Sequence, residues 1–260
     1  MPPASSRREN RATRTRPRRR VSVIGVIGEL LITAGVVALL FVAWQLWIGD
    51  AIIGSHQRAV AQQLSEQWDE ALATPAPTDQ ATSPGVAAPT KADPVVQPEA
   101  GDAETFGNMH IPRFGSDYQV PIAGGVSRAR TLDPIGFGHY PGTPMPGAVG
   151  NVAIAGHRGG NGAPLHRIAD LHVGDPIVIE TADGWYTYRF RTLEYVWPTD
   201  VDVLLPVPQR GDVAANGRYL TLTSCSPIDG SAERIIAYST FDYFTPRAAG
   251  APPSLTEAVT

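Results

Sequence analysis

The sequence predicts a mainly β protein: a closed or nearly closed β-barrel with short helices, preceded by one transmembrane helix. Three features of the 260-residue chain support this fold class. A long apolar segment lies near the N-terminus, a Pro- and Ala-rich segment follows it, and the remainder alternates short β-type runs with Gly and Pro. Short strands punctuated in this way are typical of small barrels.

Residues 1–20 form a basic segment that we expect to lie in the cytoplasm. They hold eight arginines and one acid, Glu9, whereas the whole chain has a net charge of -4. By residue count this segment carries about +7, so the remaining chain carries about -11. A basic segment beside an apolar one orients a membrane helix with that end inside. The acidic remainder argues against a nucleic-acid partner.

Residues 21–48 are nearly all apolar and are predicted to form a transmembrane anchor. From residue 30 onward, Thr33 and Gln45 are the only polar side chains of this segment. A run of about 20 apolar residues crosses a hydrocarbon core about 30 Å thick. The alternative is a cleaved signal peptide, whose apolar region is typically only about 7–15 residues long. We therefore expect an uncleaved anchor, with the residues that follow it outside the cell.

Residues 49–104 are expected to form a stalk and a linker outside the membrane. Positions 51–70 read as a polar helix. Positions 71–104 contain six prolines and many alanines, a composition that rarely buries enough apolar surface to fold. As a flexible coil this linker would span roughly 30–35 Å, which would hold the following domain away from the membrane.

The folded body is predicted over residues 105–247, followed by a disordered tail at 248–260. Seven runs are expected to be strands: Gly107–Ile111, Gln119–Ile122, Asn151–Ala155, Pro176–Thr181, Trp185–Val196, Arg218–Ser224 and Arg234–Phe241. Short helical stretches are expected at Arg128–Leu132 and Ala163–Asp170. Gly and Pro residues between the runs provide the turns.

Cys225 is the single cysteine of the chain. A lone thiol excludes an internal disulfide and any metal site built from several cysteines. An unpaired thiol in an exported domain is vulnerable to oxidation, so its presence calls for an explanation. Composition alone leaves two interpretations open: a small buried apolar residue, or a reactive nucleophile.

Two further residues join Cys225 in a pattern that suits acyl transfer. Cys225 and His157 each end an apolar run, and Arg234 opens the run that follows Cys225. Strand ends aim side chains into clefts bordered by loops. Pairing of the runs at 218–224 and 234–241 would bring Arg234 beside Cys225. A thiolate attacks a carbonyl, an imidazolium protonates the leaving amine, and a guanidinium stabilises the developing oxyanion.

These residues and their surroundings resemble the sortase family. Residues 221–225, Thr-Leu-Thr-Ser-Cys, are similar to the sortase signature of threonine, leucine, any residue, threonine and cysteine. The segments Gly138-His-Tyr-Pro-Gly142 and Ala155-Gly-His-Arg158 resemble class E sortases in particular. The resemblance covers about residues 106–245. It implies a closed barrel of about eight strands with His157, Cys225 and Arg234 as the catalytic set.

The resemblance also implies that Tyr140, Thr223 and Ser224 bind the substrate. In class E sortases a tyrosine at the place of Tyr140 is associated with a preference for Leu-Ala-x-Thr-Gly signals. The alternative for Tyr140 is a loop aromatic that packs on the barrel rim. Ser224 stands where the family usually has threonine. Serine keeps the hydroxyl and loses a methyl group, so a hydrogen-bonding role survives the difference.

A sortase of this kind cleaves a C-terminal Leu-Ala-x-Thr-Gly or Leu-Pro-x-Thr-Gly-like sorting signal between Thr and Gly. Cys225 would form a thioester, and an amine of a peptidoglycan precursor would resolve it. The expected partners are therefore secreted proteins with a sorting signal, the cell-wall amine and the membrane. No cofactor and no metal are expected, because the histidines lack a two-His motif and carboxylates at ligand spacing.

Other residues and functions were weighed against this interpretation. His139 is expected in a loop on the barrel rim, and Asp133 is expected in a turn. A catalytically silent, membrane-tethered sortase-fold binding module is the alternative function. An L,D-transpeptidase or a papain-like peptidase is disfavoured, because His157 precedes Cys225 and no Ser-His/Arg-Gly-Cys run is present.

Overall fold

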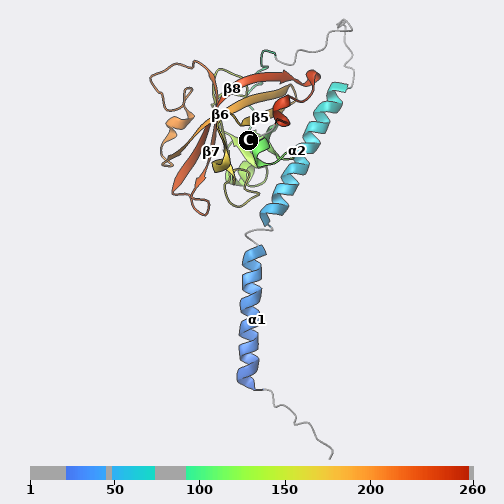
Figure 1. Cartoon of the computed structure of the whole chain (residues 1–260), viewed down its shortest axis with the longest axis vertical. Helices are drawn as coiled ribbons and strands as arrows, with labels where there is room; N and C mark the ends of the chain where they lie inside the picture. Colours follow the sequence, from blue (N-terminus) through green and yellow to red (C-terminus); the bar gives the residue numbers. More distant parts are fainter. Residues whose placement is uncertain (1–21, 45–48, 74–91, 258–260) are drawn as a thin grey trace, which may run out of the picture. The chain divides into compact units, whose positions relative to one another are not determined.

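The computed structural model describes residues 22–44, 49–73 and 92–257. The basic segment 1–20 and positions 74–91 of the predicted linker lie outside the described residues. The chain divides into two compact units, one ending at Ala43 and the other beginning at Trp44. Each unit is described separately below (Figure 1).

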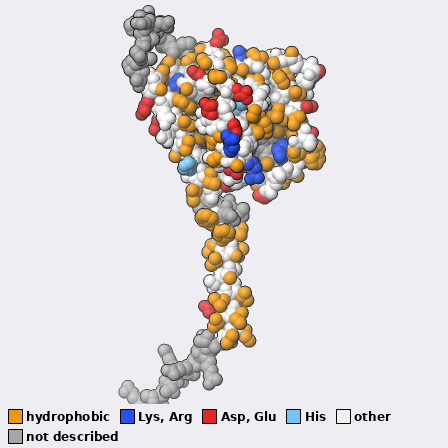
Figure 2. Space-filling model, turned by 180° about the vertical axis from the view of Figure 1, so that it is seen from behind, with side chains coloured by type: hydrophobic (Ala, Val, Ile, Leu, Met, Phe, Trp, Pro, Cys, Tyr) orange, Lys and Arg blue, Asp and Glu red, His pale blue; other side chains and the backbone are white. Residues whose placement is uncertain are grey.

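The first unit contains helix α1 (Val23–Ala43), a 21-residue helix in which Glu29 is the one charged residue. Residues 23–42 have a mean hydropathy of 2.4, which together with their length is sufficient for one membrane crossing. Figure 2 shows hydrophobic side chains covering this helix. Its length and apolar composition make the helix consistent with single-pass membrane anchoring.

The second unit is built on a closed barrel of eight strands, which confirms the predicted fold class. The strands are β1 (Thr105–His110), β2 (Gln119–Gly124), β3 (Phe137–His139), β4 (Gly150–Gly156), β5 (Pro176–Thr181), β6 (Gly184–Val196), β7 (Arg218–Ser226) and β8 (Glu233–Pro246). Their order around the barrel is β1-β2-β3-β4-β7-β8-β6-β5. The β2–β3 and β4–β7 pairs are parallel, and the other pairs are antiparallel.

Helical turns between the strands are short, as the sequence predicts. They are η2 (Pro112–Phe114), η3 (Arg128–Leu132), η4 (Ile168–Asp170), η5 (Val201–Leu204), η6 (Arg247–Ala249) and η7 (Pro253–Leu255). The predicted helical stretch at 128–132 coincides with η3, whereas only the last three residues of the stretch at 163–170 are helical.

Strand β3 is the one strand that sequence patterning misses. It has only three residues, too few to show an alternating pattern. Its central Gly138 lies so close to neighbouring chain that a Cβ there would approach the carbonyl oxygen of Gly125 to 2.4 Å. Phe137 is fully buried and fixes the strand in the core. Backbone proximity and burial, neither visible in the sequence, therefore create this strand.

The hydrophobic core is filled by aliphatic and aromatic side chains from all eight strands. The ring centroids of Tyr186 and Phe244 lie 4.7 Å apart within it. Full burial of one such large side chain stabilises the fold by about 1.5–3 kcal/mol. Representative members of the core are Met109, Ile122, Phe137, Ile154, Ile179, Tyr186, Tyr188, Leu222, Ile235 and Phe244.

Helix α2 (Gly49–Ala73) differs from the predicted stalk, because it packs along the barrel instead of standing free. Figure 1 shows it beside the strands. Ala61 and Gln57 are buried, and the carbonyl oxygen of Ala61 accepts a hydrogen bond from Asn108 Nδ2 of β1 at 2.8 Å. Sequence patterning recognises the helix but not its partner, since apolar residues on one side, such as Val60 and Leu64, show that a face is covered but not which surface covers it.

Two further segments are more ordered than their composition predicts. Within the expected linker, Ala92 N donates to the Phe244 carbonyl at 3.0 Å, and Asp102 forms a bridge with Gly124. Within the expected disordered tail, Ser254 is fully buried and its hydroxyl lies 2.9 Å from that of Thr187. Both segments are held by the barrel surface, which a composition rule does not take into account.

Candidate active site

Strand β7 carries Cys225 and lies between β4, which ends just before His157, and β8, which contains Arg234. β7 pairs in parallel with β4 and antiparallel with β8. The β4 register aligns Ala155 with Thr223, which lie two residues before the predicted histidine and cysteine. The β8 register aligns Cys225 directly with Arg234. The structure therefore brings the three predicted catalytic residues to neighbouring strand ends.

Cys225 is a free, partly exposed thiol one residue before the end of strand β7. A structural cysteine is usually fully buried, whereas reactive cysteines are partly exposed in electropositive surroundings. Arg234 is its cross-strand neighbour, and Arg158 Nη1 lies 3.5 Å from the Cys225 carbonyl oxygen. Of the two interpretations of the thiol, this setting favours the reactive one.

His157 follows β4 and is held by a carboxylate. Its Nε2 lies 2.7 Å from Asp133 Oδ1, and its side chain is only 12% exposed. Nε2 donates in this contact, because the carboxylate oxygen can only accept. Nδ1 is therefore the ring nitrogen that remains for proton transfer.

Asp133 is a functional candidate that sequence analysis assigns to a turn. It is the C-cap residue of η3, and its backbone N–H donates to the carbonyl oxygen of Arg128 at 2.8 Å. Arg128 Nε lies 3.8 Å from the same Oδ1 that binds His157. The sequence contains no local pattern that links Asp133 to a histidine 24 positions later. Only the meeting of η3 with the end of β4 reveals the pair.

Ser224 fixes the cysteine strand relative to the histidine strand. Its hydroxyl donates to the carbonyl oxygen of Gly156 at 2.7 Å, directly before His157. The side chain is 3% exposed. The hydroxyl that serine shares with the family's usual threonine thus acts between the two strand ends. In this structure Ser224 has a structural contact, and the surface that a substrate could reach is small.

Tyr140 and Thr223 form a pair of hydroxyl groups beside the catalytic strand ends. Tyr140 Oη lies 2.9 Å from Thr223 Oγ1. Tyr140 is partly exposed, whereas Thr223 is buried. The tyrosine backbone is fixed by its N–H bond to Ala153 of β4 at 2.9 Å. The ring of Tyr140 is therefore the part of this pair that a substrate can contact.

His139 differs from the predicted rim residue, because it is fully buried. Its Nε2 lies 3.0 Å from the carbonyl oxygen of Pro144 and 3.0 Å from Thr143 Oγ1. Burial lowers the pKa of His139, so the ring is neutral at physiological pH. The residue holds the 139–144 loop that presents Tyr140, which is a structural role.

Arg234 is the cross-strand partner of Cys225, and Arg158 Nη1 lies 3.5 Å from the Cys225 carbonyl oxygen. Arg234 Nη1 donates to the carbonyl oxygens of Ser231 at 3.0 Å and Glu233 at 2.9 Å, which orders the β7–β8 turn. Its other N–H groups remain for a substrate oxyanion. Arg158 was not predicted as a site residue. Among the described residues its buried Nε has no hydrogen-bond partner.

Neither a metal cluster nor the pocket beside β6 and β8 coincides with these residues. Within the described ranges, no group of three or more His, Cys, Asp or Glu side chains is arranged to hold a metal ion. A pocket of about 600 Å³ is formed by β6, the start of β7, β8 and residues 207–209. Its lining contains none of the predicted catalytic residues, so the candidate site is defined by the strand ends.

Comparisons with known proteins identify the family and the overall fold of this chain. The sortase domain family matches residues 109–242. Sortase SrtE1 of Streptomyces coelicolor is 35% identical over 96% of this chain, and the chain spans 65% of that relative's length. The solved SrtA sortase of Actinomyces oris matches with a TM-score of 0.59 and 36% identity, covering 65% of this chain and 97% of its own.

A structure of sortase E1 from Streptomyces coelicolor with a tripeptide in the active site is also similar. It matches with a TM-score of 0.55 and 37% identity and covers 60% of this chain and 99% of its own. The family match spans more than half of the chain and includes both His157 and Cys225. The chain belongs to the sortase family, whose members are cysteine transpeptidases.

Proposed function

We propose that this protein cleaves a C-terminal Leu-Ala-x-Thr-Gly or Leu-Pro-x-Thr-Gly-like signal between Thr and Gly and joins the Thr to a cell-wall amine. The observation that carries the proposal is the meeting of Cys225, His157 and Arg234 at neighbouring strand ends, with His157 bound to a carboxylate. These are the groups that thiol-based acyl transfer requires.

In the first half-reaction, the Cys225 thiolate bonds to the carbonyl carbon of the signal Thr, and the C–N bond to Gly breaks. Protonated His157 gives the Nδ1 proton to the leaving Gly amine, so a thioester and a neutral imidazole remain. Arg234 N–H groups stabilise the negative oxygen of the tetrahedral intermediate. Because the guanidinium is already fixed by the β7–β8 turn, it needs little reorganisation during the step.

In the second half-reaction, the acceptor amine attacks the thioester carbon. Neutral His157 accepts the proton that the amine loses, an amide bond forms, and Cys225 leaves as the thiolate. This restores the starting charge pair. Asp133 supports both steps, since it holds the orientation of the ring.

Recognition of the signal is proposed to involve the Tyr140 ring, with Thr223 and Ser224 behind it. Tyr140 is partly exposed and is anchored by Thr223, so its ring has a defined position next to the reacting strand. The solved sortase E1 of Streptomyces coelicolor has a tripeptide in its active site, which supports the proposal that this chain also binds a peptide. The proposed topology has the N-terminal basic segment inside, α1 in the membrane and the barrel outside.

A cleavage assay with the full chain in detergent micelles tests this function. Fluorogenic Leu-Ala-x-Thr-Gly and Leu-Pro-x-Thr-Gly peptides are supplied with and without an amine acceptor, and mass spectrometry records the adduct on Cys225. We expect cleavage at Thr–Gly, a thioester of matching mass, and no turnover by Cys225→Ala. A folded wild-type protein that neither cleaves nor forms the adduct would support the catalytically silent module instead.

A further inference from the structure

The loop that follows His157 presents backbone N–H groups that can donate hydrogen bonds to a carboxylate. Gly160, Asn161 and Gly162 have φ values of 74°, 53° and 81°. Consecutive residues in this left-handed region turn their N–H groups toward one concave side, which attracts carboxylates. The structure places the carboxylate of Asp50, from α2, at this position. Its Oδ2 accepts from Gly160 N at 3.1 Å and its Oδ1 accepts from Gly162 N at 3.2 Å.

A second α2 residue, Gln57, fixes the same loop. Its side chain is 2% exposed, and its Nε2 donates to the Asn161 carbonyl at 3.3 Å. A Cβ at position 162 would approach Gln57 Oε1 to 2.5 Å and Ile53 Cγ2 to 3.2 Å. Glycine at this position is therefore required by the close approach of α2 as well as by its φ value.

The loop held by α2 contacts the carboxylate that orients His157. Asn161 Nδ2 donates to Asp133 Oδ1 at 3.2 Å, and this is the oxygen that accepts from His157 Nε2 at 2.7 Å. Asp50 is thus connected to the imidazole in three steps. It bonds the loop backbone, the loop residue Asn161 bonds Asp133, and Asp133 bonds His157. All of these residues except Asp50 lie within the residues matched by the sortase domain family.

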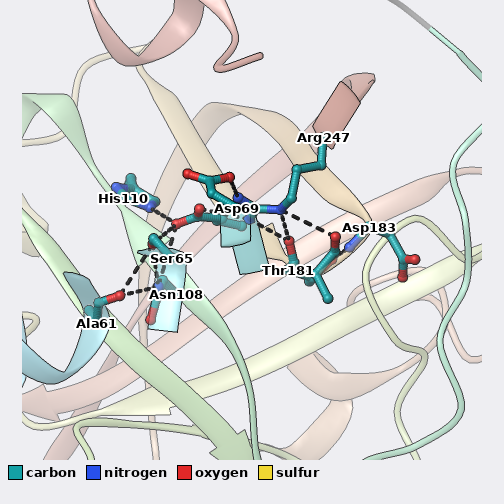
Figure 3. A network of polar contacts seen from close by, with 10 residues as sticks. Ala61, Ser65, Asp69, Asn108, His110, Thr181, Asp183 and Arg247 are labelled. Atoms are coloured by element: carbon teal, nitrogen blue, oxygen red, sulfur yellow. Dashed lines mark hydrogen bonds and ion pairs between the residues drawn. The ribbon is translucent and has the colours of Figure 1, made fainter. Parts of the chain in front are cut away.

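The other end of α2 is attached to the barrel independently (Figure 3). Arg247 Nη1 donates to Asp69 Oδ1 at 2.5 Å and Nη2 donates to Glu180 Oε1 at 2.8 Å. The Arg247 guanidinium also lies 5.3 Å from the ring of Trp68. Because this attachment is far along the helix from Asp50, each end of α2 can be altered separately.

We propose that α2 is a positioning element of the active site, with Asp50 as its principal residue. Asp50 and Gln57 hold the 158–163 loop so that Asn161 and Asp133 keep His157 in one orientation. This inference rests on the proposed function, because it assigns α2 a role in the same reaction. Asp50 lies near the start of α2, seven positions after Ala43, the last residue of α1.

The orientation of His157 reports this arrangement, because its ring is held by Asp133 Oδ1 at 2.7 Å. Other charged and titratable groups on the elements that meet here are Asp50 from α2, Arg128 from η3, Arg158 and His166 after β4, and Cys225, Asp229, Glu233 and Arg234 around the β7–β8 turn. Asp50→Ala leaves every one of these groups except Asp50 in place. A change in the pH profile therefore reflects the altered loop together with the loss of one distant carboxylate, and Asp50→Asn separates the two effects.

The test compares full-length Asp50→Ala with Asp69→Ala, a matched change at the opposite end of α2. We measure peptide cleavage from pH 5 to 9 and, separately, the pH dependence of Cys225 alkylation by iodoacetamide. We expect Asp50→Ala to lower kcat about tenfold with little change in KM, and to shift both profiles. Asp50→Asn, which has no charge but keeps one acceptor oxygen, should lie between Asp50→Ala and wild type. Asp69→Ala should lower the melting temperature and leave both profiles unchanged.

A double-variant comparison decides whether Asp50 acts through Asp133. On an Asp133→Asn background, Asp50→Ala should cause less than a twofold further loss. Additive losses, or wild-type profiles for a folded Asp50→Ala protein, would overturn the proposal. Alkylation needs no sorting signal, so this arm still tests the role of α2 if wild-type protein fails to cleave the peptides and the proposed function itself is wrong.

Discussion

At the scale of single residues, the site depends on which atom of each side chain is already engaged. His157 uses Nε2 to bind Asp133, which leaves Nδ1 for the substrate. Ser224 uses its hydroxyl to tie the cysteine strand to Gly156. Arg234 uses Nη1 to order the β7–β8 turn and keeps its other donors. His157 and Arg234 therefore combine a structural contact with further nitrogen atoms, whereas the single hydroxyl of Ser224 is already used in its contact.

Arg234→Lys tests the need for a planar group with several donors. Lysine keeps the charge but cannot bond two turn carbonyls and an oxyanion in the same geometry. Loss of one oxyanion donor costs roughly 10²–10³ in kcat. We expect a loss of about this size with little change in KM, measured by steady-state peptide cleavage. Arg210→Lys, at an exposed ion pair with Asp212, is the control and should retain the wild-type rate; an equal rate for Arg234→Lys would make Arg234 structural.

At the scale of elements, the packing of α2 on the barrel is maintained by a buried polar network. Glu180 of β5 accepts from Arg247 Nη2 at 2.8 Å and from Ser65 at 2.7 Å, and its Oε2 lies 2.9 Å from His110 Nε2. The Arg247 guanidinium also lies 4.7 Å from the ring of Trp185. Glu180 and its partners are partly or fully buried. Removing Arg247 would therefore leave the buried Glu180 carboxylate without its guanidinium partner.

This network predicts a specific loss of stability in acid. Burial tends to raise the pKa of Glu180, but its bonds to His110, Ser65 and Arg247 outweigh burial and lower the pKa from 4.5 to about 2. A carboxylate whose pKa is lowered by folding stabilises the fold at pH values above its pKa in the unfolded chain. For Glu180 this contribution is about 3 kcal/mol, and it is lost as the pH falls from about 4.5 to 2.

Urea unfolding of the full chain between pH 3 and 7 measures this contribution. Glu180→Gln should be less stable than wild type at pH 7, and the difference should shrink toward pH 3 because glutamine does not titrate. Asp212→Asn, at an exposed ion pair, is the control and should follow the wild-type curve. A constant difference between Glu180→Gln and wild type across the range would contradict the assigned pKa.

At the scale of the whole molecule, the apolar α1 and the basic segment before it predict a single-pass protein with the barrel outside. The single cysteine provides a direct assay of this topology. A membrane-impermeant maleimide should label Cys225 in intact cells. In a Cys225→Ala background, Ser5→Cys should be labelled only after the membrane is opened. Labelling of Ser5→Cys in intact cells would reverse the proposed orientation.

The sequence by itself determined the features that depend on local pattern. Apolar length predicts α1, and alternation with Gly and Pro predicts seven of the eight strands of the barrel. The strand ends at His157, Cys225 and Arg234 follow from the same patterns, because a strand and its successor fix where a side chain leaves the sheet. The resemblance of residues 221–225 to the sortase signature then identifies the chemistry.

Only the tertiary structure decided the contacts between distant segments. It pairs Asp133 with His157, buries His139, forms the three-residue strand β3 and seats α2 and the C-terminal segment on the barrel. These outcomes depend on which surfaces meet when the barrel closes. A helix face or an aspartate in a turn carries no local signal for its partner, since the contacts that define its role come from residues far away in the chain.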